Sequence, residues 1–533
     1  MSLFPNRPES GQAAPFAAAR PAALRAGAAA RARLLRWTGF APAAFFLVCI
    51  LLPPLNHDVA AVLDFSRRWL AGERLYVDLV DVNPPLIYLM NLLPAALARW
   101  TILTPVQALL LCLVGYAVLL WRMTEALRAG RVEGTVEAAV LTTTIPLLLV
   151  MAGSDFGQRD VMMGMAAIPY ALLAARRVEG PPAPWPLALG VTVVAALAFA
   201  LKPYFLAVPL LVEALVLRRR GLRHWRRDPI PWAMGLVWLA YLLVVLIAFP
   251  VFWEQVLPFA WQVYGRIHGP GFWGVLGTDV MGAAAFLMLA MPFALRRQSG
   301  AFAQTLAAAA LGAFLSAWAQ HKGWTYHVMP LTILGCGAVA VAAARWADRV
   351  LPAVRAQAAA PMLAALAAFG VTLYSVRGGE TPWRQTAFHG ETPGRLADWL
   401  QRNAHGADVL ALSPDLFPLQ PALTYAEAHQ HLHAMSIWLL QGAYRTCPPG
   451  PEPYREPHQM GAVEYAFFQR TAEEFALSPP RALVVTRHAN IPACADRFDL
   501  LQYFLRHPLF AEAFLRYQPA GEIDGHRLFL RQD

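Results

Sequence analysis

The stretch TGFAPAAFFLVCILLPPLNHD, residues 38–58, joins an apolar segment to an ionisable pair. Its first 18 residues carry no charge and are long enough to cross the hydrocarbon core of a bilayer as a helix. The segment ends at His57 and Asp58, and ionisable residues at the edge of a membrane span usually have a function. The stretch therefore predicts a membrane protein with a polar site at one bilayer face, centred on Asp58.

The composition extends this prediction to most of the chain. Of the 533 residues, 57% are hydrophobic and only 15% are charged, whereas a soluble domain carries about 25% charged residues. The net charge of +10 would also suit a nucleic-acid binder. The arginines, however, punctuate apolar runs instead of forming one basic patch, which is typical of the signals that orient membrane proteins.

Apolar segments of spanning or nearly spanning length recur along the chain. We count eleven, with approximate bounds 38–55, 104–121, 136–152, 161–175, 185–201, 204–217, 231–252, 275–295, 301–319, 328–344 and 358–374. Residues 83–100 are interrupted by Pro94, so we expect them to lie in the membrane interface. The sequence thus predicts a bundle of about 11–12 transmembrane helices.

Basic residues fall at every second connection between these segments. The basic connections are 122–131, 176–177, 218–227, 296–297 and 345–355. Because cytoplasmic loops carry the excess of Lys and Arg, these loops and the N-terminus are predicted to be cytoplasmic. Residues 1–35 are rich in Ala, Arg and Pro, and we interpret them as a disordered basic tail, not as a cleaved signal peptide.

The connections on the other side, predicted to be exterior or periplasmic, hold a different set of side chains. The first, residues 56–101, begins with His57 and Asp58. The later ones supply the other candidate site residues, which are Asp155, Arg159, Asp160, Lys202, Arg266, His268, His321, Lys322, Tyr326 and His327. Few cations occur in short exterior loops, so Lys202 and Lys322 indicate an anionic ligand.

Residues 377–533 are polar and rich in Pro and Gly, and they are numerous enough to form a small core of their own. Short β-prone runs at 408–412, 482–486 and 526–530 alternate with helical stretches such as 395–401, which predicts a small exterior α/β domain. Cys447 and Cys494 lie in this region, where both a disulfide and two free thiols are compatible with the sequence. The other three cysteines lie in apolar runs and are predicted to be buried.

The sequence His429-Gln430-His431-Leu432-His433 also drew our attention. Alternate histidines on a strand face one way and could bind a metal. No cysteine or carboxylate stands at standard zinc spacing, however, and a solvated histidine-rich loop is the interpretation we prefer. We assign no metal ligands.

An exterior membrane enzyme has no nucleotide at hand, so an activated group must arrive on a lipid. A polyprenyl-phosphate sugar suits these residues. Its phosphate needs cations, and an acceptor hydroxyl that attacks the anomeric carbon needs a base to take its proton. The departing phosphate gains charge in the transition state, which a fixed Lys or Arg stabilises.

These features resemble the GT-C superfamily of polyprenyl-phosphate-sugar glycosyltransferases, which includes the protein O-mannosyltransferases and the lipid A aminoarabinose transferases. The matching residues are Asp58, Pro84-Pro85-Leu86, Asp155 with Asp160, and the region after Arg377. Two departures are visible. The family usually has Asp-Glu where this chain has His57-Asp58, and often has a phosphate-binding Lys where Asn83 stands.

The resemblance implies that residues 36–376 form a catalytic GT-C-like membrane domain. Asp58 would be the base, or would orient the acceptor. Phosphate contacts would come from Lys202, Arg266 and Lys322, in place of the missing Lys at position 83. The residues that shape the site or contact substrate would be His57, Asp155, Arg159, Asp160, His268, His321, Tyr326 and His327.

Structural alternatives exist for several of these residues. Asp58 could cap a helix, and Lys202 could extend to the interface. Asp155 and Arg159, four residues apart, could share a helix face as a surface ion pair.

We therefore expect an inner-membrane glycosyltransferase that moves one sugar from a polyprenyl-phosphate donor to an exterior lipid, glycan or protein acceptor with inversion. We do not expect a divalent cation. The alternatives are a flippase or transporter for lipid-linked sugars and a non-catalytic partner in the assembly of envelope polysaccharide.

Overall fold

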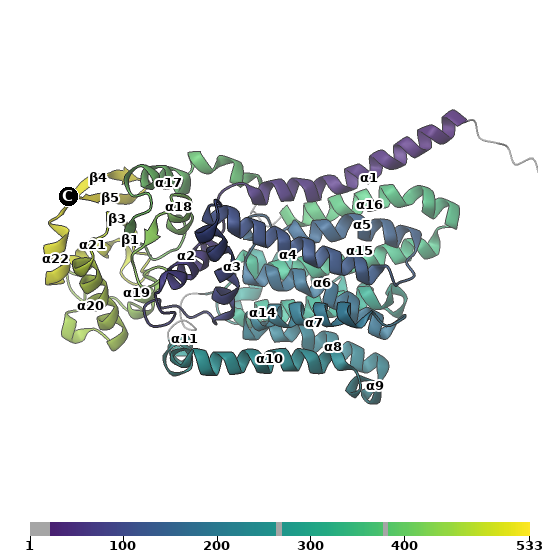
Figure 1. Cartoon of the computed structure of the whole chain (residues 1–533), viewed down its shortest axis with the longest axis horizontal. Helices are drawn as coiled ribbons and strands as arrows, with labels where there is room; N and C mark the ends of the chain where they lie inside the picture. Colours follow the sequence, from purple (N-terminus) through teal and green to yellow (C-terminus); the bar gives the residue numbers. More distant parts are fainter. Residues whose placement is uncertain (1–21, 263–268, 377–381, 533) are drawn as a thin grey trace, which may run out of the picture.

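A computed structural model of the protein describes residues 22–262, 269–376 and 382–532. Figure 1 shows a long bundle of helices with a compact α/β part at one end. Seven helices of the bundle are long and apolar enough to cross a membrane, and four shorter apolar helical segments accompany them. The predicted class, a multi-span helical membrane protein, is confirmed.

The membrane helices coincide with the apolar segments of the sequence. The longer ones are α1 (Ala22–Leu51), α4 (Pro105–Arg128), α6 (Arg159–Val178), α10 (Pro229–Ala248), α14 (Gly300–Gln320), α15 (Thr325–Val350) and α16 (Ala353–Val376). The four shorter apolar segments are α3 (Leu86–Trp100), α5 (Thr135–Val150), α7 (Trp185–Ala200) and the pair α12 (Asp279–Met288) and α13 (Met291–Ala294); α8 (Ala207–Arg220) lies beside them. Brief elements connect them: η1 (Gly153–Asp155), η2 (Pro203–Leu206), α9 (Leu222–Arg226), η3 (Phe252–Val256), α11 (Leu257–Gln262), η5 (Gly274–Gly277) and η6 (Arg297–Ser299).

Helix α1 begins at Ala22, well before the apolar segment that starts at residue 38. Residues 22–35, which the sequence predicted to be disordered, are therefore helical in this structure. Their run of alanines and arginines explains the difference, because both residues rank among the strongest helix formers.

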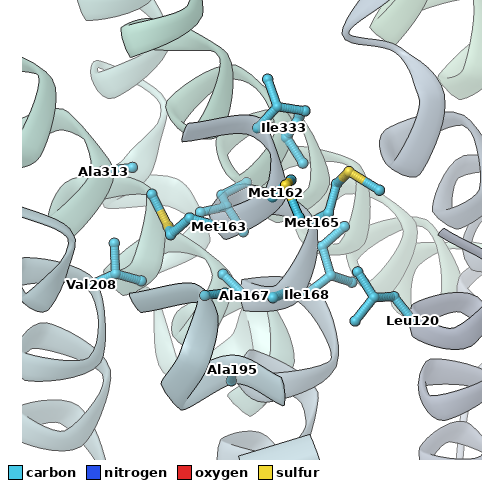
Figure 2. Packing of buried hydrophobic residues seen from close by; sticks show 14 of the residues in the cluster. Leu120, Met162, Met163, Met165, Ala167, Ile168, Ala195, Val208, Ala313 and Ile333 are labelled. Atoms are coloured by element: carbon cyan, nitrogen blue, oxygen red, sulfur yellow. The ribbon is translucent and has the colours of Figure 1, made fainter. Parts of the chain in front are cut away.

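Helix α6 lies at the centre of the bundle and is buried along almost its whole length. Figure 2 shows its Met162, Met163, Met165 and Ile168 among side chains of the surrounding helices. Helices α6 and α15 pack closely, since a Cβ on Gly164 would lie 2.9 Å from Pro330 Cα. This close approach brings the start of α6, with Arg159 and Asp160, next to the start of α15.

Helices α2 (His57–Ala71) and α3 (Leu86–Trp100) lie where the bundle meets the α/β part (Figure 1). Helix α2 buries an apolar face that includes Val59, Val62 and Phe65. Arg68 of α2 donates a hydrogen bond to the Leu432 carbonyl of the α/β part, and Arg470 of the α/β part donates to the Val77 and Asp78 carbonyls in the loop after α2. The α/β part is thereby fixed against α2.

The α/β part contains a five-stranded sheet of order β2-β1-β3-β5-β4. Its strands are β1 (Asp408–Leu412), β2 (His429–Gln430), β3 (Ala482–Thr486), β4 (Tyr517–Ile523) and β5 (His526–Arg531). Its helices are η7 (Pro382–Gly390), α17 (Thr392–Asn403), α18 (Leu419–Tyr425), α19 (Trp438–Ala443), η8 (Pro457–Gln459), α20 (Ala462–Leu477), η9 (Ala495–Arg497), α21 (Leu500–Leu505) and α22 (Pro508–Phe514). Three of the strands were predicted from the sequence, and Cys447 and Cys494 form a disulfide.

Candidate functional site

Asp58 lies in the first turn of α2, at the end of the bundle that faces the α/β part. Asn56 caps this helix by accepting a 2.9 Å hydrogen bond from the Asp58 backbone N–H, so the interpretation of Asp58 itself as the cap is wrong. Gln158 Nε2 donates to Asn56 Oδ1 at 2.7 Å and to Asp58 Oδ2 at 2.9 Å. The Asp58 side chain is 18% exposed, so it remains accessible to a ligand.

The charge of Asp58 is set by its neighbours. Burial alone would raise the pKa of its carboxyl, but the charges of His57 and Arg159 and the Gln158 hydrogen bond outweigh burial and hold the pKa below its ordinary value. His57 Nε2 lies 3.7 Å from Asp58 Oδ1. Asp58 is therefore an ionised carboxylate at neutral pH, as a general base must be.

Asp155 and Arg159 do not form the surface ion pair that their spacing allowed. Asp155 ends η1 and Arg159 begins α6, so they share no helix face, and both are buried. Asp155 accepts hydrogen bonds from Asn56 Nδ2 at 3.1 Å and from Thr325 Oγ1 at 3.2 Å. Arg159 donates to Asn83 Oδ1 and lies close enough to Asp58 to stabilise its negative charge.

Asp160 and Lys202 form an ion pair beside this group. Lys202 Nζ donates to Asp160 Oδ2 at 2.7 Å and to Gln320 Oε1 at 3.0 Å. Gln320 Nε2 in turn donates to Asp160 Oδ1 at 3.3 Å. All three side chains are largely buried, so Lys202 lies within the protein at this site and does not simply extend to the interface.

Tyr326 and His327 complete the group from the first turn of α15. Lys202 Nζ lies 5.4 Å from the centre of the Tyr326 ring, and the Tyr326 and His327 rings are 4.6 Å apart. His327 Nδ1 is buried without a hydrogen-bond partner in the part of the chain that the structure describes. We refer to Asp58, Asp155, Arg159, Asp160, Lys202, Tyr326 and His327 as the Asp58 site.

The remaining predicted residues lie around this site or outside the described residues. His57 begins α2 and stacks edge-on against Phe417 of the α/β part, with ring centres 6.2 Å apart. His321 and Lys322 follow α14, and His321 Nδ1 lies 2.9 Å from the Ala319 carbonyl oxygen. Arg266 and His268 lie outside the described residues, so their predicted role stays a prediction.

One solved structure shares this architecture over nearly the whole chain. ArnT from Cupriavidus metallidurans bound to undecaprenyl phosphate is 13% identical, with a TM-score of 0.51 over 95% of this chain and 98% of its own. ArnT is a GT-C protein. The chain has the GT-C fold. The apo state of ArnT from the same organism covers 95% of this chain and 97% of its own at 14% identity, with a TM-score of 0.49. No family model and no curated protein matches the sequence.

Within this GT-C fold, four amides connect the charged residues that the sequence singled out. Asn56, Asn83, Gln158 and Gln320 each contact at least one charged member of the Asp58 site. Of these four, only Asn83 was considered from the sequence, as the position where a Lys is missing. A signal was available, since each stands within three residues of a charged candidate or of the Pro-Pro motif.

A narrow, mostly apolar pocket of about 70 Å³ begins beside the Asp58 site. Asp155 and Thr325 form its polar end. The rest of the lining is mostly apolar, including Phe46 of α1, Ala284 of α12 and Val328 of α15, and it also contains Thr332, Tyr374 and Ser375. A ligand with a polar head and an apolar tail matches this change in lining.

The three histidines at positions 429, 431 and 433 do not converge on one point. His429 Nδ1 lies 4.0 Å from Asp64, His431 Nδ1 lies 3.8 Å from Asp408, and His433 Nδ1 lies 2.8 Å from Glu474. No group of three metal-ligating side chains is present among the described residues.

Proposed function

We propose that this protein transfers a sugar from a polyprenyl-phosphate donor to an acceptor hydroxyl, with Asp58 as the base. The observation that carries the proposal is the hydrogen-bond partner of Arg159 at the Asp58 site. Arg159 is buried, yet its hydrogen-bond partner there is the neutral amide of Asn83. A buried cation without a directly bonded carboxylate is costly alone and is well suited to a phosphate.

In this proposal the phosphate of the donor lies between Arg159 and Lys202. Lys202 is already neutralised by Asp160, so Arg159 supplies most of the positive charge. The neighbouring apolar pocket would accept the first part of the isoprenoid chain. ArnT, which shares the fold, has been solved with undecaprenyl phosphate bound, and this supports a donor of the same chemical type.

The reaction would proceed in one displacement. The acceptor oxygen forms a bond to the anomeric carbon while the bond from that carbon to the phosphate oxygen breaks. Asp58 takes the proton of the hydroxyl, and polyprenyl phosphate leaves with the bonding electron pair. Attack from the face opposite the leaving group inverts the anomeric configuration, and Arg159 stabilises the charge that develops on the phosphate.

We also propose that the Asp58 site and the α/β part face the periplasm of a bacterial inner membrane, with the N-terminus in the cytoplasm. Two observations support this orientation. The connections rich in arginine, predicted to be cytoplasmic, include Arg128 and Arg177 at the ends of α4 and α6 far from α2. The Cys447–Cys494 disulfide belongs in an oxidising compartment.

The direct test uses the full-length protein in nanodiscs with a panel of polyprenyl-phosphate sugars and candidate acceptors, with and without a chelator. We expect release of polyprenyl phosphate from at least one donor, a product of inverted configuration, and loss of both in Asp58→Asn. A flippase would instead move a labelled donor across liposomes without releasing polyprenyl phosphate. Such flux, or full turnover in Asp58→Asn, would contradict the proposal.

A further inference from the structure

A second polar cavity lies between α2 and the α/β part. Its volume is about 400 Å³. Arg67, Arg68 and Ala71 line it from α2, and His429, His431 and Asp408 line it from the edge of the sheet. Asp408 is 53% exposed, so the cavity opens to solvent on that side.

The cavity is distinct from the Asp58 site, and helix α2, which contributes residues to both, fixes the distance between them. Arg67 follows Asp58 by nine residues on the same helix, which corresponds to roughly 14 Å at 1.5 Å per residue. The distance suits a ligand that extends from one site to the other. No residue of the Asp58 site lines the cavity.

Most of the charges around the cavity are already neutralised. Arg68 forms a two-bond pair with Glu73, at 2.8 and 2.7 Å. Glu474 accepts hydrogen bonds from Arg470 at 2.7 Å and pairs with His433 at 2.8 Å. These pairs fix the walls and leave little net charge.

Two lining groups with opposite charge remain open to a ligand. Arg67 makes no hydrogen bond or close ion pair with any residue that the structure describes. Asp408 is 3.8 Å from His431, and His429 and Arg68 also stabilise its charge, but it forms no direct pair with an arginine or lysine of the described residues. Behind them, Asp64 is 5% exposed and its Oδ2 has no hydrogen-bond partner in the described residues. Burial raises the pKa of the Asp64 carboxyl, which favours its neutral form.

The cavity offers a ligand one charged hydrogen-bond donor, Arg67, and one charged acceptor, Asp408. This favours a ligand whose groups can both donate and accept hydrogen bonds. A phosphate would meet only one uncommitted guanidinium and would be repelled by Asp408, Glu73 and Glu474. A sugar hydroxyl both donates and accepts hydrogen bonds, so it pairs equally well with Arg67 and with Asp408. The cavity therefore suits a neutral, hydroxyl-rich ligand.

We infer that the cavity between α2 and the sheet edge binds a neutral oligosaccharide portion of the acceptor. This inference rests on the proposed function, because it places the non-reacting sugars of an acceptor at a fixed distance from Asp58. Binding energy gained there would position the reacting hydroxyl at the Asp58 site. The acceptor would accordingly be a glycan or a glycolipid, not an unmodified protein.

The test measures binding with no donor present, using the full-length protein in nanodiscs. The probes are neutral tri- and tetrasaccharides of hexoses and N-acetylhexosamines, together with their phosphorylated counterparts. We expect at least one neutral oligosaccharide to bind at millimolar concentration or below, more tightly than its phosphorylated form. Arg67→Gln and Asp408→Asn should each weaken binding by about tenfold, the effect of one hydrogen bond to a charged group.

Two further variants make the result decisive. Ala71→Trp places a large ring on an exposed position of the cavity wall, so it should abolish binding without disturbing the fold. Arg487→Gln removes an exposed arginine that pairs with Glu522 elsewhere on the α/β part, and it should bind normally. Absence of binding across the neutral probes, tighter binding of the phosphorylated probes, or unchanged binding in Ala71→Trp would overturn the inference.

The experiment also separates this inference from the proposed function. Asp58→Asn should bind the oligosaccharide as the parent protein does. If oligosaccharide binding persists while no polyprenyl phosphate is ever released, the proposed function fails and the cavity stands. If polyprenyl phosphate is released but Arg67→Gln changes neither binding nor the KM for acceptor, the cavity fails and the proposed function stands.

Discussion

Helix α6 has a buried arginine at each end, and the two are held differently. Arg177, near its C-terminus, pairs directly with Glu213 at 2.5 Å and with Asp228 at 2.7 Å. Arg159, at its N-terminus and roughly 27 Å away along the helix, donates to the amide of Asn83. The helix dipole favours a cation at the C-terminus and disfavours one at the N-terminus. The arginine at one end is therefore held by direct ion pairs, whereas Arg159 has carboxylates such as Asp58 and Asp160 nearby but a hydrogen bond to an amide.

The difference extends to the neighbours of each arginine. Near Arg177, carboxylates contact arginines directly, as in the pairs Arg220–Asp228 at 2.7 Å and Arg128–Glu133 at 2.8 Å. At the Asp58 site, Lys202 pairs directly with Asp160 and His57 lies 3.7 Å from Asp58, but the side-chain hydrogen bonds of Asp58 and Arg159 go to the amides of Gln158 and Asn83. A fully paired network stabilises a fold, whereas a network spaced by amides leaves charges for a substrate.

The largest expected effect is on catalysis by Asp58→Asn. The amide keeps the shape and the hydrogen-bond contact with Gln158 but cannot take a proton, so transfer should fall by about 10²–10⁴-fold. Donor binding and thermal stability should stay close to those of the parent protein. Steady-state release of polyprenyl phosphate measures the loss, with Asp78→Asn, a partly exposed carboxylate in the same loop, as the control. Equal losses in both variants would remove Asp58 from its proposed role.

Arg177→Gln should act on stability instead. It leaves the partly buried Glu213 with only its hydrogen bonds from Tyr170 and Trp225, and it removes one of two arginines from Asp228. Breaking such a pair costs about 3–5 kcal/mol, so we expect a clear drop in the unfolding midpoint in detergent. Turnover per folded molecule should not change. Loss of turnover with an unchanged midpoint would show that the two ends of α6 do not differ as described.

Arg159→Gln should show the reverse pattern. Its hydrogen bond goes to an amide and its nearby carboxylates are not directly paired with it, so the free energy of unfolding should fall less than in Arg177→Gln. Loss of a charged hydrogen bond to phosphate is worth about 1.5–3 kcal/mol, which predicts about 10- to 100-fold weaker donor binding. A binding assay with a labelled polyprenyl-phosphate sugar measures it. An unchanged donor Kd would contradict the assignment of Arg159 to the phosphate.

Asn83→Asp would make the N-terminal end of α6 resemble the other end. A carboxylate beside Arg159 neutralises its charge, so affinity for the donor should fall by about tenfold. This is the lower limit of the loss expected when the arginine is removed. Thermal stability should fall, because the Asn83 amide donates a 2.6 Å hydrogen bond to the buried Asp81, and the new carboxylate would lose that bond and repel Asp81 even though Arg159 gains a partner. Asn91→Asp, on the adjacent α3, tests whether any added carboxylate has the same effect. Tighter donor binding in Asn83→Asp would oppose the comparison of the two ends.

The sequence predicted the helices and the position of the charged residues better than it predicted the contacts between them. Hydropathy and the alternation of arginine-rich loops predicted the helices and the separation of the charged residues into two groups, because lipid strongly constrains both. The strands at 408–412 and 482–486 were predicted to the residue, since both are short apolar runs between turn signals.

The contacts within the site could not be read from the sequence. Spacing placed Asp155 and Arg159 on one helix, but the chain turns between η1 and α6, and the two side chains bond to segments about 75 to 170 residues away. The amides were missed because charge and hydropathy do not distinguish a neutral polar side chain; only their positions beside charged candidates or the Pro-Pro motif pointed to them. Their role depends on which loops meet in space, and only packing determines that.

The smallest expected effect concerns pH and uses two carboxylates of α2. The pKa of Asp58 is held below its ordinary value of about 3.9, whereas burial raises that of Asp64. A base works only when ionised, so transfer should be lost only as pH falls through the lowered pKa of Asp58. Between pH 5 and 8, the rate of transfer should therefore show no acid limb from Asp58. If the rate of transfer falls with decreasing pH above pH 5 and still does so in Asp64→Asn, the reacting base is not Asp58 in the environment described. If that fall in rate disappears in Asp64→Asn, it is caused by the titration of Asp64.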